Sequence, residues 1–532
     1  MSRTVIIVLL TFALFLLAGC SDPVGTPIDE DKTILNENFH MFPGNGTRSL
    51  PTTVTLHWYY DYADEDTRYN LYFADSENPR TLLGNALLDG TAIIEGLDQF
   101  TTYFWRIEAV DSEGTLIEKS SDYRFSTIAE DYIVSFPDTL LERAVRDAIS
   151  LPEGSILTSY INDLMELDAN GYGIIELNNI DLMPALRVVD LGMNEVTDLT
   201  PLEDNLSIAT LTLAGNPLVD LSPLSSIANL FTLDVSQLAN AQWDSLSGLT
   251  QIRRLYASQN GSDLTIHVSQ MDWLKALTLD HNELTDADWA SNLTSLEELS
   301  IEGNEISDLT PLSGLTELWT LDASLNDISD LTPLSTLTKM DHLKLGGNAI
   351  TDMSPLLTMT NLTWLELQDN QIAGLPTQMT DWGLSLQLLR ISDNPLDPET
   401  HNRFGALTAL EYLIANNVGL TNLDALSGTP NLIWLEAAGN AIDDISALGE
   451  LENLVLIDLT DNQIDDITAL ALPEWMSRLY LDNNQIQDLS ALVVNTFFAD
   501  GDTLSITGNP LSDEAINEDI PDLIERGVVV NF

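Results

Sequence analysis

The sequence predicts a mixed repeat fold, in which a solenoid of about 16 turns of about 22 residues carries a parallel sheet on its concave side and follows a small all-β sandwich. Three observations predict this fold. Asparagine returns at a spacing of 22 residues, leucines keep a fixed phase around it, and residues 49–128 instead alternate between apolar and polar side chains. A period of two is typical of strands, whereas a long fixed period is typical of stacked turns.

The segment Leu318–Leu334 shows the repeat most clearly. It reads LWTLDASLNDISDLTPL, which resembles the leucine-rich repeat signature of a strand, a turn and a convex return. One turn cannot bury its leucines alone, so neighbouring turns are expected to stack into one core across residues 164–511. The position of Asn326 recurs in steps of 22, 24 or 25 residues at Tyr172, Asn194, Asn216, Leu238, Asn260, Asn282, Asn304, Asn326, Asn348, Asn370, Asn394, Val418, Asn440, Asn462, Asn484 and Asn509.

The asparagine column has an expected structural role. Its carboxamide carries donors and an acceptor, so it can satisfy backbone groups of its own and adjacent turns where the chain leaves the strand. After it, a Thr or Ser followed by Pro is expected to cap a short convex helical turn with its hydroxyl. These pairs are Thr200-Pro201, Ser222-Pro223, Thr310-Pro311, Thr332-Pro333 and Ser354-Pro355.

The first residues have the pattern of a secretion signal, predicted over 1–19. Arg3 precedes an apolar run that is too short for a comfortable membrane span. The run ends in Leu-Ala-Gly-Cys20, which resembles the lipobox of bacterial lipoproteins and implies a lipidated Cys20, the chain's single cysteine; the alternative is a plain signal peptide with an incidental cysteine. By the same resemblance, Ser21 after the cysteine favours the outer membrane of a bacterial cell envelope.

Residues 20–48 are predicted to be a tether, because they are rich in Asp, Asn, Gly and Pro. The sandwich predicted over 49–128 resembles a fibronectin type III domain, on the basis of Trp58 and of Tyr103 at the end of the segment LDQFTTY. Trp58 and Trp105 lie on the alternating apolar face, and we expect them in the core of a spacer domain rather than in a ligand site.

Both ends of the solenoid need caps, because a terminal turn otherwise exposes its core. Phe136–Ile149 has helical spacing of apolar residues, and the cap predicted over 133–163 resembles the helical N-terminal cap of internalin-like repeat proteins. Residues 512–532 are predicted to form a helix and a terminal strand that close the last turn.

The charge of the chain is strongly negative. Against 83 acidic residues there are 20 basic ones, so the formal charge is −63, or −64 without Arg3. This excludes nucleic acid as a partner and is typical of proteins in saline surroundings. Some of the acids form a column four places after the asparagine position, at Asp198, Asp220, Asp286, Asp308, Asp330, Asp352, Asp444, Asp466, Asp488 and Asp513.

Two interpretations of this aspartate column are open. Each carboxylate can accept backbone N–H bonds in its own loop, or the stacked carboxylates can hold divalent cations. No D-x-[DN]-x-[DN]-G calcium loop supports the second interpretation, and no metal site or cofactor is predicted. The six histidines are scattered and neither H-E-x-x-H nor G-x-S-x-G occurs, so we do not expect an enzyme.

The candidate ligand site follows from strand geometry. In each turn, the residues six and four places before the asparagine position are predicted to point out from the concave sheet, and they form two columns. Over five successive turns the first column is apolar or aromatic, and charged residues flank it, a pattern that favours an interface. The predicted binding residues are Trp364, Glu366, Leu388, Arg390, Tyr412, Ile414, Trp434, Glu436 and Tyr480.

Two structural alternatives compete with this site. The longer turns after Asn370 and Asn394 can fold over the stripe, or Trp364 and Trp434 can stack on each other. The candidate ligand site and the predicted lipid anchor together indicate a lipid-anchored surface protein that binds a protein or a glycan. This protein is expected to contact the membrane only through its anchor. The alternatives are a structural envelope or matrix component, or a non-catalytic accessory of a polysaccharide-processing system.

Overall fold

The computed structural model describes residues 39–532, apart from 45, 61–62, 64–66, 77, 89, 99–100, 128–131 and 204. The chain divides into two compact units, Met1–Glu130 and Asp131–Phe532. The predicted signal peptide, Cys20 and residues up to 38 of the tether lie outside the described residues. Among the described residues, no helix has the length and apolar character needed to cross a membrane.

The first unit is a sandwich of two sheets around one apolar core. The smaller, antiparallel sheet has the order β1 (Phe39–Phe42), β3 (Val54–Tyr60) and β6 (Thr91–Ile94). The larger sheet has the order β2 (Thr47–Leu50), β9 (Tyr123–Thr127), β7 (Thr102–Val110), β4 (Arg68–Ala74) and β5 (Leu82–Leu87), with β8 (Leu116–Lys119) also paired to β7.

Alternation along the strands places the predicted core residues inside this sandwich. Trp58 and Trp105 are 5% and 0% exposed, as expected. The hydroxyl of Tyr103 accepts a hydrogen bond from the backbone N–H of Asp98 at 2.7 Å and so fixes the turn before β7. The predicted tether boundary was wrong, because β1 and β2 begin within 20–48 and Phe39 is fully buried; four residues give too short an alternation to identify β1 from the sequence.

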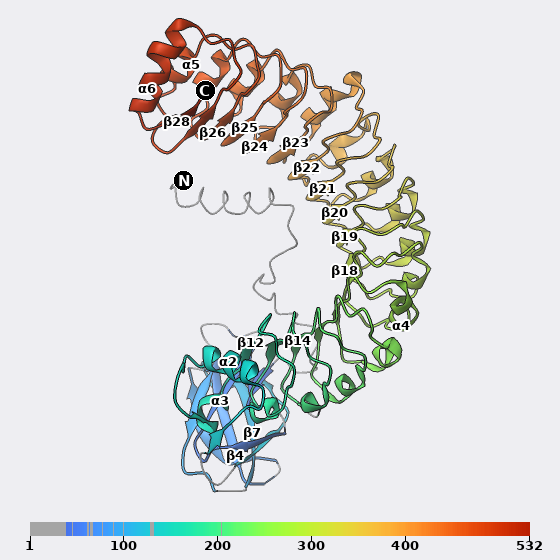
Figure 1. Ribbon diagram of the computed structural model, residues 1–532, viewed down its shortest axis with the longest axis vertical. Coiled ribbons are helices and arrows are strands. Elements are labelled where there is room, and N and C mark those ends of the chain that lie inside the picture. The colour runs from blue at the N-terminus through green and yellow to red at the C-terminus, as the bar shows by residue number, and fades with distance from the viewer. Residues whose placement is uncertain are drawn as a thin grey trace. The chain divides into compact units, whose positions relative to one another are not determined.

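The second unit contains a parallel sheet of 17 strands in chain order, which line the inner side of the curved repeat unit (Figure 1). The strands are β12 (Glu166–Asp168), β13 (Val188–Asp190), β14 (Thr210–Thr212), β15 (Thr232–Asp234), β16 (Arg254–Tyr256), β17 (Ala276–Thr278), β18 (Glu298–Ser300), β19 (Thr320–Asp322), β20 (His342–Lys344), β21 (Trp364–Glu366), β22 (Leu388–Arg390), β23 (Tyr412–Ile414), β24 (Trp434–Glu436), β25 (Leu456–Asp458), β26 (Arg478–Tyr480), β27 (Thr503–Ser505) and β28 (Val529–Asn531). Strands β12–β27 correspond to the sixteen predicted turns, which are thereby confirmed.

Short helices, mostly 3₁₀, lie on the outer side of the turns (Figure 1). They are η1 (Ile180–Leu182), η2 (Thr200–Leu202), η3 (Ser222–Ser226), η4 (Trp243–Gly248), η5 (Ser262–Leu264), α4 (Thr265–Val268), η6 (Asp288–Ala290), η7 (Thr310–Gly314), η8 (Thr332–Thr336), η9 (Ser354–Thr358), η10 (Met379–Asp381), η11 (Pro398–Ala406), η12 (Asp424–Gly428), η13 (Ser446–Glu450), η14 (Thr468–Ala471) and α5 (Ser490–Val494).

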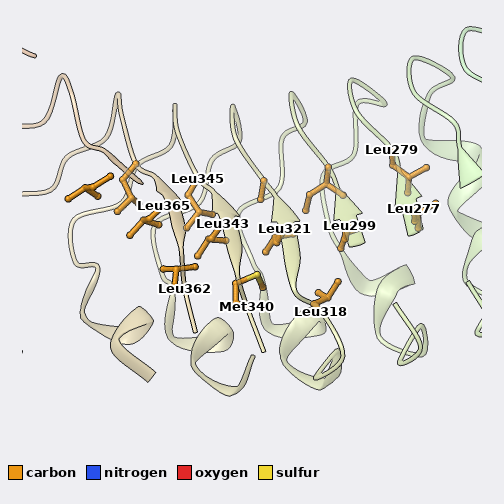
Figure 2. Packing of buried hydrophobic residues seen from close by; sticks show 14 of the residues in the cluster. Leu277, Leu279, Leu299, Leu318, Leu321, Met340, Leu343, Leu345, Leu362 and Leu365 are labelled. Carbon is orange, nitrogen blue, oxygen red and sulfur yellow. The ribbon is translucent and has the colours of Figure 1, made fainter. Parts of the chain in front are cut away.

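Between the strands and the outer helices lies one continuous apolar core. Figure 2 shows how equivalent side chains of successive turns follow one another, with Leu321 and Leu343 from the strands and Leu318 and Met340 from the segments that lead into them. All four are 0% exposed. Each turn therefore completes its core only with its neighbours.

The asparagines satisfy the backbone as predicted. The Nδ2 of Asn326 donates to Ile301 O in the preceding turn at 2.9 Å and to Ala323 O in its own turn at 3.3 Å. Its Oδ1 accepts the N–H of Ile306 in the preceding turn at 3.0 Å. Each such carboxamide joins two turns, and we call the series the asparagine ladder.

The helical turns are capped differently from the prediction. Thr200 and its equivalents are the first residues of their helices and their hydroxyls do not cap; the aspartate two places earlier accepts their N–H instead. This holds for nine of the ten column members, all except Asp513, at 2.7–3.1 Å, and it confirms the structural interpretation for those nine. Hydrogen bonds from Ser222 and Ser446 hold the pKa of Asp220 and of Asp444 below its ordinary value.

The caps cover both ends of the core. At the N-terminal end, β10 (Ile133–Val134) pairs with β11 (Ile156–Leu157), and α2 (Thr139–Ala148) and α3 (Thr158–Ile161) accompany them, so the predicted helix is confirmed but shorter at both ends. At the C-terminal end, a π-helical segment η15 (Ala515–Asp519), α6 (Ile520–Glu525) and β28 close the last turn as predicted.

Candidate functional site

The candidate site lies on the concave side of β20–β26, where the register aligns the two predicted columns. Trp364 pairs with Leu388 and Glu366 with Arg390, and the same register continues from strand to strand to Tyr480 in β26. The residue between the two columns on each strand, such as Leu365 or Leu389, is 0% exposed on the core side. The column residues are therefore on the opposite face of the sheet.

Much of the predicted stripe is covered. Leu388, Ile414 and Trp434 are 2%, 6% and 4% exposed, so the expectation that these three present exposed surface was wrong. They do not belong to the main core cluster on the other side of the sheet. Strands lie about 5 Å apart, so large side chains in adjacent positions of one column cover each other and form a second, thin apolar layer.

The partly exposed members are Trp364, Glu366, Arg390, Tyr412, Glu436 and Tyr480. Both tryptophans are fixed by the glutamate two places along the same strand. Trp364 Nε1 donates to Glu366 Oε1 at 2.7 Å, and Trp434 Nε1 donates to Glu436 Oε1 at 2.8 Å. The repeated Trp-Leu-Glu sequence of β21 and β24 thus gives the same local unit twice.

The charged members of the second column are also paired. Arg390 Nη1 lies 3.5 Å from Glu366 Oε2, and Asn416 Nδ2 donates to Glu436 Oε2 at 3.4 Å. Burial raises the pKa of Tyr412, and the nearby Glu411 carboxylate adds to this shift. These interactions orient the side chains before any ligand arrives.

The aromatic surface extends further toward the N-terminal end than the sequence indicated. The His342 ring stacks on Trp364, with centroids 5.9 Å apart and an interplanar angle of 25°, and Trp319 meets His342 edge-on at 6.2 Å. We call these three residues the aromatic ladder. Trp319 was missed because it lies seven places before its asparagine, outside the two predicted columns. The available signal was that Trp319 comes one turn before His342, which is a member of the first column.

Neither structural alternative for the stripe applies. Trp364 and Trp434 lie on β21 and β24, three strands and therefore about 14 Å apart, so they do not stack. The extra residues of the two longer turns extend the outer segments that carry η10 and η11, which pack against each other, and η11 also packs against η12.

Acidic side chains occupy the concave side beyond the aromatic ladder, over β17–β19. Asp280 Oδ1 accepts hydrogen bonds from Ser300 Oγ at 2.6 Å and from the N–H of Glu302 at 2.9 Å. Burial, and then the charge of Asp322, raises the pKa of Glu302. Lys344 Nζ lies 3.5 Å from Asp322, so one cation partly balances this group.

Comparisons with known proteins agree with this architecture. The family described as Leucine Rich repeats (2 copies) matches residues 272–314. A leucine-rich repeat protein of Leptospira interrogans is 23% identical, covers 70% of this chain and 97% of its own, and has a TM-score of 0.61. The functional domain of InlJ from Listeria monocytogenes is 23% identical over 75% of this chain and 80% of its own, with a TM-score of 0.50.

An internalin of Listeria monocytogenes is 26% identical over 68% of this chain and 94% of its own, with a TM-score of 0.44. A search of curated proteins gave no match. The repeats and the likeness to the Leptospira protein and to the InlJ domain show that the second unit has the fold of a leucine-rich repeat domain. The InlJ domain includes a cysteine ladder, whereas this chain, whose single cysteine is Cys20, has an asparagine ladder.

Proposed function

We propose that this chain is a lipid-anchored cell-surface protein that binds a protein partner, without catalysis, on the concave side of its repeat unit between β19 and β26. The observation that carries the proposal is a row of partly exposed aromatic side chains on a curved sheet, in which Trp319, His342 and Trp364 contact one another and Trp364 is fixed by a glutamate. Tryptophan and tyrosine are the residues that most often dominate protein interfaces, and fixing them in advance lowers the entropic cost of binding.

Binding is tested by capture with the immobilised full-length protein from host, bacterial and glycan fractions. The double substitution Trp364→Ala and Tyr412→Ala is expected to remove the captured protein. The matched control is Trp475→Ala, because Trp475 is 39% exposed and lies outside the concave columns. If the double variant captures the same protein as the wild type, the concave site is refuted; selective capture of a glycan would replace the protein partner with a sugar.

Trp434 serves as a structural comparison within the same surface. Because its side chain is 4% exposed, Trp434→Ala is expected to cost about 3 kcal/mol of unfolding free energy through the cavity it leaves. Trp364→Ala leaves a partly exposed site and is expected to cost less. Chemical denaturation of both variants separates loss of binding from loss of folding.

The anchor is proposed from the lipobox-like sequence that ends in Cys20. Acyl chains on this cysteine would hold the protein stably at a membrane, and Ser21 supports the outer membrane of a bacterial envelope. Cys20→Ala is expected to move the protein from the membrane fraction to soluble or unprocessed forms. Unchanged membrane retention after normal signal cleavage would contradict lipidation.

A further inference from the structure

We propose that the aromatic ladder of Trp319, His342 and Trp364 seats a cationic side chain, arginine in particular, of a basic protein partner. The proposal rests on the proposed function and deepens it, because it names the charge of the partner and the place of its anchor residue.

The aromatic ladder is one accessible part of the concave aromatic surface, beside the partly exposed Tyr412 and Tyr480. Trp319 is 38% exposed, and the His342 side chain is 40% exposed, whereas Leu388 and Trp434, further along the stripe, are almost fully covered. A ligand that lies on the concave sheet therefore meets these rings before it meets the covered part of the stripe.

Trp319 presents the most ring surface of the three, because it is 38% exposed and the His342 ring already covers one face of Trp364. The indole N–H of Trp364 is already donated to Glu366 at 2.7 Å, so this ring has no free donor for a ligand. The rings can still offer a ligand the negative potential above their uncovered faces, which attracts ammonium and, more often, guanidinium groups. Arginine is favoured because its planar group stacks on aromatic rings and is more weakly hydrated than an ammonium.

Carboxylates surround the aromatic ladder. Asp341 Oδ2 lies 3.3 Å from His342 Nδ1, its Oδ1 accepts the hydroxyl of Thr363 at 2.5 Å, and its side chain stays 36% exposed. Glu366 and Asp322 lie on the strands on either side of β20. Lys344 and Arg390 already lie 3.5 Å from Asp322 and Glu366, so Asp341 is the carboxylate that a guanidinium group on the rings can reach while it stacks.

The charge of the whole chain favours the same partner. With a formal charge of −63, the protein repels acidic proteins and speeds the approach of basic ones. Long-range attraction acts over the whole surface, however, so it selects the class of partner and not the site. The site is selected by the exposed rings.

The test uses the peptide (Gly-Arg)5 as the probe, with fluorescence anisotropy on the full-length protein at pH 8 and 0.15 M NaCl. We expect the double substitution Trp319→Ala and Trp364→Ala to weaken binding at least about tenfold, because each ring contributes a cation–π contact. Trp475→Ala, with similar exposure at a site outside the concave columns, is expected to leave the affinity unchanged. Equal affinity of the ladder variant and the wild type would overturn the proposal, because binding would then follow overall charge alone.

A second probe isolates the charge of the ligand. In (Gly-citrulline)5 each guanidinium is replaced by a neutral group of nearly the same shape, and we expect it to bind at least about tenfold more weakly. Equal binding of the two peptides to the wild type would overturn the cationic ligand, while the concave protein site tested by Trp364→Ala and Tyr412→Ala would stand. Unchanged capture by the double variant Trp364→Ala and Tyr412→Ala in that earlier experiment would instead refute the proposed function itself.

Discussion

At the scale of single residues, the position before each member of the asparagine column shapes the turn. Every residue at this position has a positive φ, which bends the chain out of the strand. The sixteen residues are Gly171, Met193, Gly215, Gln237, Gln259, His281, Gly303, Leu325, Gly347, Asp369, Asp393, Asn417, Gly439, Asp461, Asn483 and Gly508. Glycine, Asn and Asp tolerate this conformation, but leucine does not, so Leu325 stores local strain.

Leu325→Asn is therefore expected to stabilise the repeat unit by about 1 kcal/mol. Asn417 and Asn483 already hold the same conformation, at φ 55° and 56°, and Leu325 is 52% exposed, so little burial is lost. The measurement is the midpoint and slope of urea unfolding. Leu325→Ala is the control, because it keeps a Cβ at positive φ and should bring no gain; equal stabilisation by both variants would show that strain is not the cause.

The position before the asparagine column could not be predicted from the sequence. Asn326 and its equivalents could be predicted, because one residue type repeats for one chemical reason. The preceding position requires only a positive φ, which Met193, Gln237 and Leu325 adopt at a cost in conformational energy. The residue type at this position therefore varies from turn to turn. The glycines that recur at Gly215 and later turns were the available signal.

At the scale of elements, the N-terminal cap depends on one carboxylate. Asp138 accepts the N–H groups of Leu140 and Leu141 in α2 and those of Ile175 and Glu176 in the first turn, at 2.7–3.3 Å. Burial acts to raise the pKa of Asp138, but these four donors outweigh it, and the pKa lies below its ordinary value. The same side chain thus caps the helix and joins it to the solenoid.

Asp138→Ala is expected to lower the free energy of unfolding by about 2 kcal/mol at pH 7. This value is at the upper end of the range for the loss of a helix cap, because the substitution also leaves two N–H groups of the first turn without their acceptor. A carboxylate with a lowered pKa in the folded state stabilises above its ordinary pKa, and this contribution disappears as the pH falls through the folded value. The difference between variant and wild type should therefore shrink below about pH 4. Urea unfolding at pH 7 and at acidic pH measures this; a difference that stays constant with pH would contradict the role of the charge.

The concave stripe shows which part of the site could not be predicted. Strand alternation correctly placed Trp364, Tyr412 and Trp434 on the concave side. Their exposure depends on how close the neighbouring strands bring their side chains, and this is a property of the assembled sheet. Trp434 is therefore covered by its neighbours, whereas Trp319, which lies outside the two predicted columns, is exposed.

At the scale of the whole molecule, the formal charge of −63 has a cost for stability. Like charges on a compact surface repel each other, and salt screens this repulsion within about 10 Å at 0.1 M. The melting temperature is therefore expected to rise as NaCl increases from about 0.01 M to 1 M. A melting temperature that does not change over this range would contradict net repulsion.

Calcium at matched ionic strength is the control for the aspartate column. Nine of these aspartates already accept backbone N–H bonds, so calcium is expected to add nothing beyond screening. A further rise in melting temperature at micromolar to millimolar calcium would instead favour cation binding by the stacked carboxylates.

The asparagine ladder also decides how the repeat unit would respond to mechanical tension. A carboxamide joins most adjacent turns, but apolar side chains take its place at Leu238 and Val418, where this link between turns is missing. A molecule stretched between its two ends should first separate at these two joints and extend as three blocks. The repeat unit would therefore extend in steps as the force increases. The block from Leu238 to Asn394, which carries Trp319 and Trp364, would remain folded while the blocks on either side separate from it.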